Sequence, residues 1–151
     1  IAEYDDEGAP AHFIYGLNQR HKHIPEIMAY TGLTVQPIFA PAVGRFAQGM
    51  AVQVPLRLDG DRTTAALFEA LADHYADQTF VQVAPTGQIS ARIVPTDLNG
   101  TNLLRISVHG DDDNGCATVV AVLDNLGKGA SGAAVQNLNI MLGYDESEGL
   151  V

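Results

Sequence analysis

The sequence is poor in cysteine, in cationic residues and in long apolar runs. One cysteine, Cys116, occurs in 151 residues, so no internal disulfide can form and a reducing compartment, the cytoplasm, is expected. The chain has 8 Lys and Arg against 18 Asp and Glu, and its net charge of −10 argues against a nucleic-acid partner. No run reaches the about 20 apolar residues that cross a bilayer, and the N-terminus IAEYDDEGAP has no signal-peptide character, so no membrane association is expected.

Glycine-rich cofactor motifs are also missing. No GxGxxG fingerprint follows a predicted strand, so we find no dinucleotide-binding domain of that type. The stretch GKGAS at 127–131 lacks the upstream glycine, and the Ser or Thr after the lysine, that a P-loop requires. Asp111–Asp113 lack the alternating spacing of a calcium loop, and a solvated turn is expected there. The chain opens on Ile1 without Met, as expected of a segment cut from a longer sequence.

The sequence contains enough apolar residues, 46%, for one globular domain with a core. Helical spacing and end signals predict three helices, at 24–32, 63–77 and 127–143. Apolar and alternating runs predict strands at 12–17, 33–44, 49–60, 80–85, 89–94, 103–110 and 116–125. Strands outnumber helices and several neighbours look antiparallel. We therefore predict an α+β fold with a mostly antiparallel or mixed sheet and helices packed on one face.

Local signals fix some of these elements more closely. Pro25 suits the first turn of the first helix and Gly32 its end, and Thr63 or Thr64 can cap the second helix. Asn114-Gly115 predicts a hairpin turn between the last two strands. The second helix is expected to bury one stripe, made of Ala66, Leu67, Ala70, Leu71, His74 and Tyr75.

The densest group of cationic and titratable side chains lies in YGLNQRHKHIPEI, residues 15–27. His21 and His23 point to the same side if the backbone there is extended, and they precede a helix start. The positive end of a helix disfavours imidazolium, so a histidine there can act as a base near neutral pH. Arg20 and Lys22 would attract an anion. These residues indicate an acid/base and anion-binding site.

Two other interpretations compete with that one. His21, His23 and Glu26 are similar to the metal ligands of cupins, although the spacings are short, Pro25 interrupts the expected strand, and no second motif follows. The histidines can also be ordinary surface or helix-capping residues, and the local chemistry alone favours this last interpretation.

The order and spacing of several blocks carry a wider resemblance. Tyr15, HKHIPEI, IFAPAVGRFAQGM and DNLGKGASGAAVQNLNIMLG occur in turn over almost the whole chain. The chain resembles the C-terminal part of N-acetyl-γ-glutamyl-phosphate reductase, in its shorter bacterial branch. The resemblance implies a fold like the C-terminal domain of glyceraldehyde-3-phosphate dehydrogenase. It also implies a substrate-binding and dimerisation domain at 1–124, with a C-terminal helix and tail at 125–151 that would pack on an NADP-binding domain absent from this chain.

The resemblance implies an oxidoreductase of arginine biosynthesis that uses NADPH to reduce N-acetyl-glutamyl 5-phosphate to the semialdehyde, with release of phosphate. A cysteine forms a thioester with the acyl group, and the histidine that handles the proton corresponds to His21. The nucleophile lies in an NPGCY-type turn that this chain lacks. Cys116 is expected to be a small strand residue instead, so the chain alone should be inactive.

Further site residues follow from the same resemblance. The candidates for gripping substrate carboxylate or phosphate are Tyr15, Arg20, Lys22, His23, Arg45 and Gln48. Arg45 can equally be a solvated loop arginine, and Glu26 is expected to be a helix-end partner of a cation. The candidates for contacting NADP are Asn125, Gly127, Lys128 and Gly129. A homo-oligomer is implied as well. The alternative from another class is a non-catalytic assembly or ligand-binding domain, which would keep the sheet without the chemistry.

Overall fold

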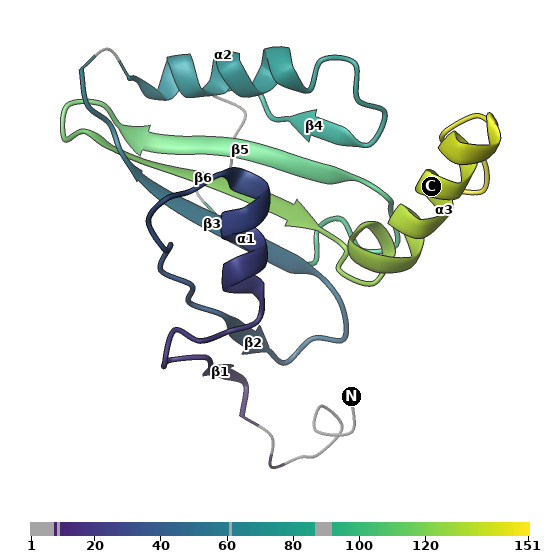
Figure 1. Cartoon of the computed structure of the whole chain (residues 1–151), viewed down its shortest axis with the longest axis horizontal. Helices are drawn as coiled ribbons and strands as arrows, with labels where there is room; N and C mark the ends of the chain where they lie inside the picture. Colours follow the sequence, from purple (N-terminus) through teal and green to yellow (C-terminus); the bar gives the residue numbers. More distant parts are fainter. Residues whose placement is uncertain (1–7, 9, 61, 87–91) are drawn as a thin grey trace. The chain divides into compact units, whose positions relative to one another are not determined.

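The computed structural model describes residue 8 and residues 10–60, 62–86 and 92–151. The chain divides into two compact units, Ile1–Ala47 and Gln48–Val151. Figure 1 shows their elements, and each unit is described by itself. The α+β prediction is confirmed, because the described residues form α-helices together with an antiparallel pair of strands and a mixed sheet.

The first unit contains strand β1 (His12–Ile14), helix α1 (His23–Thr31) and strand β2 (Ala42–Gly44). The two strands pair antiparallel, with Phe13 opposite Val43. The predicted strands at 12–17 and 33–44 are therefore too long: the first ends at Ile14, and only the last three residues of the second are extended in a ladder.

Helix α1 confirms the first predicted helix. Pro25 lies in its first turn, where the missing N–H costs no hydrogen bond. Gly32 ends the helix in the left-handed conformation, with φ of 70°, and its N–H donates to the carbonyl of Met28. The sequence thus determined both ends of this helix.

The second unit is built on a four-stranded sheet with the order β3-β6-β5-β4. Its strands are β3 (Met50–Arg57), β4 (Val81–Val83), β5 (Leu104–Asp111) and β6 (Cys116–Leu123). Strand β6 pairs antiparallel with both β3 and β5, whereas β4 pairs parallel with β5. Pro55 is tolerated within β3 because that strand lies at the end of the order and has one ladder neighbour.

The hairpin between β5 and β6 confirms the predicted turn and shows its size. Asp111 pairs with Cys116, so four residues form the loop, and Gly115 takes a φ of +60° at its end. The Asp111 carboxylate accepts hydrogen bonds from the backbone N–H groups of Asp113 and Asn114. The Asp111 side chain therefore holds the backbone of the acidic turn. The predicted solvated turn is thus also stabilised by hydrogen bonds within the chain.

Helix α2 (Thr64–His74) is capped by Thr63, whose hydroxyl oxygen accepts from the N–H of Ala66 at 3.1 Å. The Asp112 carboxylate adds a bond from the N–H of Thr64 at 2.8 Å, so a negative charge lies at the positive helix end.

The buried stripe of α2 is rotated from the predicted one. Ala66, Ala70 and His74 are exposed, so half of the predicted stripe is wrong. Phe68 is the largest apolar side chain of this helix, and turning it inward removes more apolar surface from water than the alanines would. The half-buried side chains follow the spacing of one helical face and are Thr64, Leu67, Phe68, Leu71, Ala72 and Tyr75.

The core of the second unit forms where a loop meets β6. Leu98 packs with Val120 and Val122, and further half-buried residues surround them: Ala51, Ile93 and Leu103. Residues 89–91 of the predicted strand at 89–94 lie outside the described residues, and 92–94 are not a strand. Ile93 therefore contributes to the core from a loop, because a non-repetitive segment can pack on a sheet without joining its ladder.

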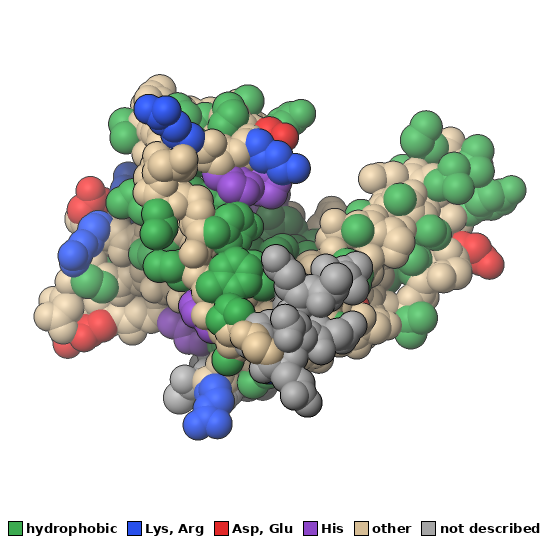
Figure 2. All heavy atoms as spheres, turned by 90° about the horizontal axis from the view of Figure 1, so that it is seen from below, with side chains coloured by type: hydrophobic (Ala, Val, Ile, Leu, Met, Phe, Trp, Pro, Cys, Tyr) green, Lys and Arg blue, Asp and Glu red, His purple; other side chains and the backbone are tan. Residues whose placement is uncertain are grey.

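The last helix begins with a π-helical turn, η1 (Gly127–Ser131), and continues as α3 (Gly132–Leu142). Gly143 ends it with φ of 75°, as the sequence predicts. Hydrophobic side chains stand exposed along this segment, which lies at the right of Figure 2. Among the described residues, none of the helices has the length and apolar character needed to cross a bilayer.

Replacing Thr63 by Ala should destabilise the second unit by about 1 kcal/mol, because the first turn of α2 loses its side-chain acceptor. Chemical denaturation of the two proteins measures the difference. Thr63→Ser keeps the hydroxyl and should stay near wild type. Equal losses for Ala and Ser would contradict the capping role.

Candidate functional site

In the first unit, the histidine segment folds into a cluster of four rings, which we call the ring cluster: Tyr15, His21, His23 and Phe39. The His21 ring is at its centre, with centroid distances of 5.7 Å to Tyr15, 4.7 Å to His23 and 4.9 Å to Phe39. The structure therefore brings together three of the predicted site residues, and adds Phe39.

His21 also caps helix α1. Its Nδ1 accepts from the backbone N–H of His23 at 3.3 Å, and its carbonyl accepts from the N–H of Ile24 at 3.0 Å. An accepting Nδ1 carries no proton, so the neutral ring holds its proton on Nε2. Protonation of Nδ1 would break this bond and add positive charge at the positive end of the helix. In the capped state Nε2 can donate a hydrogen bond to a ligand, and it can accept a proton only after the cap opens and Nδ1 carries the proton instead.

Gln19 holds the segments on either side of His21 together. Its side-chain Nε2 donates to the carbonyl of Phe39 at 2.8 Å, and its Oε1 accepts from the Phe39 N–H at 2.9 Å. Gln19 also has a positive φ of 54°, which is rare for a residue other than glycine. No sequence signal marks this role, because a glutamine in a polar stretch normally indicates solvent exposure. Phe39 lies in the block IFAP, which carried part of the resemblance.

The predicted cationic residues of this unit are exposed. Arg20 and Lys22 lie on either side of His21 and form no ion pair within the described part of the chain. Lys22 occupies the cap position of α1 without a capping side-chain bond, and Glu26 follows in its first turn. Arg45 comes directly after β2, and its N–H donates to the carbonyl of Ala11. Arg20 and Lys22 could therefore meet an anion beside the ring cluster.

The cupin-like arrangement is not formed. Over the residues that the structure describes, no three His, Cys, Asp or Glu side chains come together as metal ligands would. His21, His23 and Glu26 are all among these residues, and Nδ1 of His21 is already engaged by a backbone amide.

In the second unit, the predicted residues Gln48, Gly127 and Gly129 bond a buried residue, Asp124, which is 2% exposed. Its Oδ2 accepts from Nε2 of Gln48 and from the N–H of Gly100, both at 2.8 Å. Its Oδ1 accepts from the N–H groups of Leu126 at 2.9 Å and Gly127 at 3.0 Å. Burial raises the pKa of Asp124, but these hydrogen bonds outweigh burial and leave the pKa lowered.

Several predicted ligand-binding groups are thus used within the fold. Besides Gln48 and Gly127, Asn125 accepts through Oδ1 from the N–H of Gly49 at 2.7 Å, and the N–H of Gly129 donates to the Asp124 carbonyl at 2.8 Å. Gly49 has a φ of 112° and no room for a side chain, since a Cβ would lie 2.6 Å from the Pro95 carbonyl oxygen. The amides of Gly127 and Gly129 are therefore occupied in this conformation.

Lys128 makes a separate set of contacts. Its Nζ donates to Oε1 of Gln136 at 2.6 Å and lies 5.6 Å from the centre of the Phe80 ring. Burial lowers the pKa of Lys128, while the nearby negative charge of Glu146 partly opposes that effect. The side chain that was predicted to meet NADP is therefore tied into the base of the last helix, and its role toward a ligand stays a prediction.

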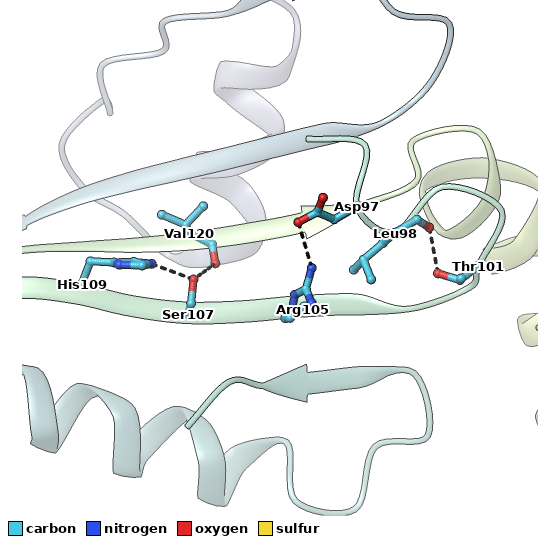
Figure 3. A network of polar contacts seen from close by, with 7 residues as sticks. All are labelled: Asp97, Leu98, Thr101, Arg105, Ser107, His109 and Val120. Atoms are coloured by element: carbon cyan, nitrogen blue, oxygen red, sulfur yellow. Dashed lines mark hydrogen bonds and ion pairs between the residues drawn. The ribbon is translucent and has the colours of Figure 1, made fainter. Parts of the chain in front are cut away.

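The second unit also has a cavity of about 650 Å³ that no sequence motif indicates. Polar groups reach it from β5: Arg105 pairs with Asp97 at 3.6 Å, and the Ser107 hydroxyl lies 2.9 Å from Nε2 of His109 (Figure 3). The Ser107 hydroxyl also lies 3.4 Å from the carbonyl of Val120, a second acceptor within its reach. These contacts place polar side chains on the same sheet face as the core valines.

Comparisons with known proteins identify the family of the chain. The sequence model of the semialdehyde dehydrogenase dimerisation domain matches residues 5–125 of the chain. The chain belongs to this family. The match includes the ring cluster and the whole four-stranded sheet, which confirms the fold class expected from the resemblance.

Curated relatives make the resemblance more specific. The chain is 47% identical to an N-acetyl-γ-glutamyl-phosphate reductase of Brucella anthropi, over 95% of the chain and 49% of the relative. It is 46% identical to the enzyme of that name from Sinorhizobium medicae, over 94% of the chain and 49% of the relative. The enzyme of that name from Brucella ovis is 45% identical, with 95% and 49% covered. The predicted resemblance is confirmed, and the chain spans about half the length of these relatives.

Asp124→Asn should lower the free energy of unfolding by about 3 kcal/mol, because a buried amide cannot accept all four bonds. The lowered pKa also sets the pH dependence. The stabilisation from Asp124 is complete above its unfolded pKa of about 3.9 and is lost as pH falls through the lower folded value.

Urea denaturation of both proteins from neutral to acidic pH measures both effects. Wild type should lose free energy of unfolding at acidic pH through the protonation of Asp124, and the variant should not show this part of the loss. Asp113→Asn, on the exposed hairpin loop, is the matched control and should change little. Equal stability of Asp124→Asn and the control would contradict the role of this carboxylate.

Proposed function

We propose that this chain is the substrate-binding and dimerisation region of an NADP-dependent N-acetyl-γ-glutamyl-phosphate reductase, with His21 as its acid/base residue. The identity of 45–47% with reductases of this name supports the activity. The observation that carries the role of His21 is its place at the centre of the ring cluster, between the exposed Arg20 and Lys22, with the contact of Nδ1 to the His23 N–H orienting the ring. A ring fixed in this way presents one defined nitrogen, Nε2, to a ligand.

The proposed reaction needs a nucleophile and a hydride donor that other parts of the enzyme would hold. A cysteine thiolate attacks the acyl carbon, phosphate leaves, and a thioester forms. NADPH supplies the hydride that reduces the acyl carbon. The oxygen of the resulting thiohemiacetal takes up a proton, and loss of that proton accompanies C–S cleavage to the aldehyde and thiolate. His21 is the group that gives and removes this proton at Nε2, in a state whose Nδ1 carries a proton and whose capping bond to the His23 N–H is therefore released.

The neighbours of His21 would hold the anionic groups of the substrate. Arg20 and Lys22 are exposed beside the ring cluster, and neither is neutralised by an ion pair within the described residues. Guanidinium and ammonium groups bind carboxylate and phosphate, so these two are our first substrate ligands. Tyr15, His23, Arg45 and Gln48 are further candidates. Of these, Gln48 would have to exchange its bond to Asp124 for one to substrate.

NADP would be held mainly by a domain outside this chain, because no glycine-rich fingerprint is present. Of the predicted contacts, Gly127 and Gly129 donate their amides to Asp124. Asn125 uses Oδ1 for Gly49, and its side-chain Nδ2 has no partner within the described residues. This NH₂ group suits a carbonyl acceptor such as that of the nicotinamide carboxamide.

His21→Asn should lower turnover by a factor of about 10² to 10⁴, as expected when a general acid/base is lost. The assay mixes this chain with a cofactor domain of a relative that carries the cysteine. It then follows phosphate-dependent reduction of NADP⁺ by N-acetylglutamate semialdehyde. His12→Asn is the matched control, an exposed histidine in β1 of the same unit.

Activity that appears on mixing and collapses only with His21→Asn establishes both the reductase and the role of His21. If mixing restores activity and the variant keeps it, the acid/base assignment is wrong. A partner that docks without restoring activity would favour the alternative, a non-catalytic assembly domain. The name of the matching domain family gives that alternative its support.

The segment 125–151 is proposed to pack on the cofactor domain. Met141 is 81% exposed and Leu138 is 53% exposed, and other large apolar side chains of this segment are exposed as well: Leu126, Ile140, Leu142 and Tyr144. An exposed apolar patch of this kind is typical of an interaction site. The exposed valines of β3, Val52 and Val54, suit the proposed contact with a second copy, because β3 lies at the end of the strand order.

The double variant Leu138→Ala/Met141→Ala should weaken binding of the cofactor domain by tenfold or more, since each exposed side chain would lose its buried contact with the partner. Titration calorimetry measures the affinity. Tyr30→Ala, another exposed apolar side chain, is the control and should bind as wild type does. Unchanged affinity of the double variant would exclude this surface as the docking site.

A further inference from the structure

We propose that Gln19 is a positioning residue for His21, acting through the backbone and ring of Phe39. This inference rests on the proposed function only for its kinetic consequence, because its structural part concerns the orientation of a ring. Gln19 belongs to none of the substrate, catalytic or cofactor groups derived above.

The Gln19 side chain pairs with the backbone of Phe39. Its amide meets both the carbonyl and the N–H of Phe39, at 2.8 and 2.9 Å, as a paired strand would. A side chain with one donor and one acceptor at the right spacing can thus fix the backbone of Phe39 in position and in rotation. Gln19 is half-buried, so these two bonds compete less with water than exposed ones would.

The backbone of Gln19 adopts a rare conformation. Gln19 is the one non-glycine residue with positive φ among the described residues, at 54°. An L-residue adopts this conformation at a cost, and it persists where the surroundings require it. The Gln19 N–H donates to the carbonyl of Gly16, and Nε2 of Gln36 donates to the Gln19 carbonyl. The loop before His21 is therefore held in its strained form from several sides.

The two bonds from Gln19 position the ring of Phe39 against the ring of His21. The Phe39 ring contacts the His21 ring with a centroid distance of 4.9 Å and also lies 6.1 Å from the His23 ring. The Nδ1 bond of His21 restrains one edge of the ring but leaves rotation about that bond. Phe39 packs against the ring and removes this freedom. Gln19 thereby orients Nε2 of His21, although its own side chain bonds only the backbone of Phe39.

The test compares Gln19→Ala with Gln36→Ala in this chain, labelled with ¹⁵N at histidine and ¹³C at phenylalanine. Gln36 is the matched control, because its side chain bonds the carbonyl of Gln19 and makes no hydrogen bond to Phe39 within the described part of the chain. NMR spectra report the His21 tautomer and the cross-peaks between the His21 and Phe39 rings. Gln19→Ala should reduce these cross-peaks at least threefold and mix the tautomers, while Gln36→Ala should preserve both. The α1 amide signals show whether the unit remains folded.

The kinetic part uses the reconstituted enzyme described above. Gln19→Ala should lower kcat about tenfold or more and leave KM within about twofold, since misorientation affects the proton transfer more than substrate binding. Cross-peaks and tautomer like those of wild type in Gln19→Ala would overturn the proposal. If that variant unfolds, Gln19→Glu decides. It keeps the acceptor for the Phe39 N–H but lacks the donor, and a wild-type His21 signature in it would also overturn the proposal.

The two proposals fail in different ways. A displaced His21 ring in Gln19→Ala together with full activity of His21→Asn would reject the acid/base role and keep Gln19 as the residue that orients the ring. Loss of activity in His21→Asn with an undisturbed ring and turnover in Gln19→Ala would reject the positioning role alone.

Discussion

The second unit depends on the need of one buried carboxylate for hydrogen-bond donors. Asp124 lies at the end of β6, and its oxygens collect a side chain from the start of β3, an amide from the loop at Gly100 and two amides from the start of the last helix. An ionised group in this position is stable only if its donors are in place. The carboxylate therefore fixes where β3 begins, where the covering loop turns, and how the π-helical turn leaves the sheet.

That constraint gives the glycines and the asparagine at 125–129 a role within the fold. These residues were expected to bind a cofactor through free amides at a helix start. In the folded unit, the amides of Gly127 and Gly129 serve Asp124, and the Asn125 oxygen serves Gly49. The first amides of the last helix thus donate to Asp124, a residue of the protein itself. A helix start can bind a ligand anion in the same way.

The first unit also depends on an acceptor for backbone amides at a helix start. The amide of His23 at the start of α1 needs an acceptor, and the His21 ring provides it. The ring is then fixed by Phe39, whose backbone is held by Gln19. Capping and the proposed catalysis use the ring in two different states, because the cap needs an unprotonated Nδ1 and proton transfer at Nε2 needs the proton on Nδ1. The cationic side chains beside it remain exposed, as a site for an anion requires.

The sequence by itself determined the elements whose signals are local. Pro25 and Gly32 fix α1, Thr63 caps α2, and Asn114-Gly115 marks the hairpin, because each acts within a few residues of itself. The blocks around His21 and Gly127 carried the family resemblance in the same local way. Tertiary structure decided everything that depends on a distant partner: which face of α2 is buried, the irregular path of residues 33–41, the donors of Asp124, and the clamp of Gln19 on Phe39. Gln19 and Phe39 are 20 positions apart and Gln48 and Asp124 are 76 apart, so no spacing within the sequence can reveal these two contacts.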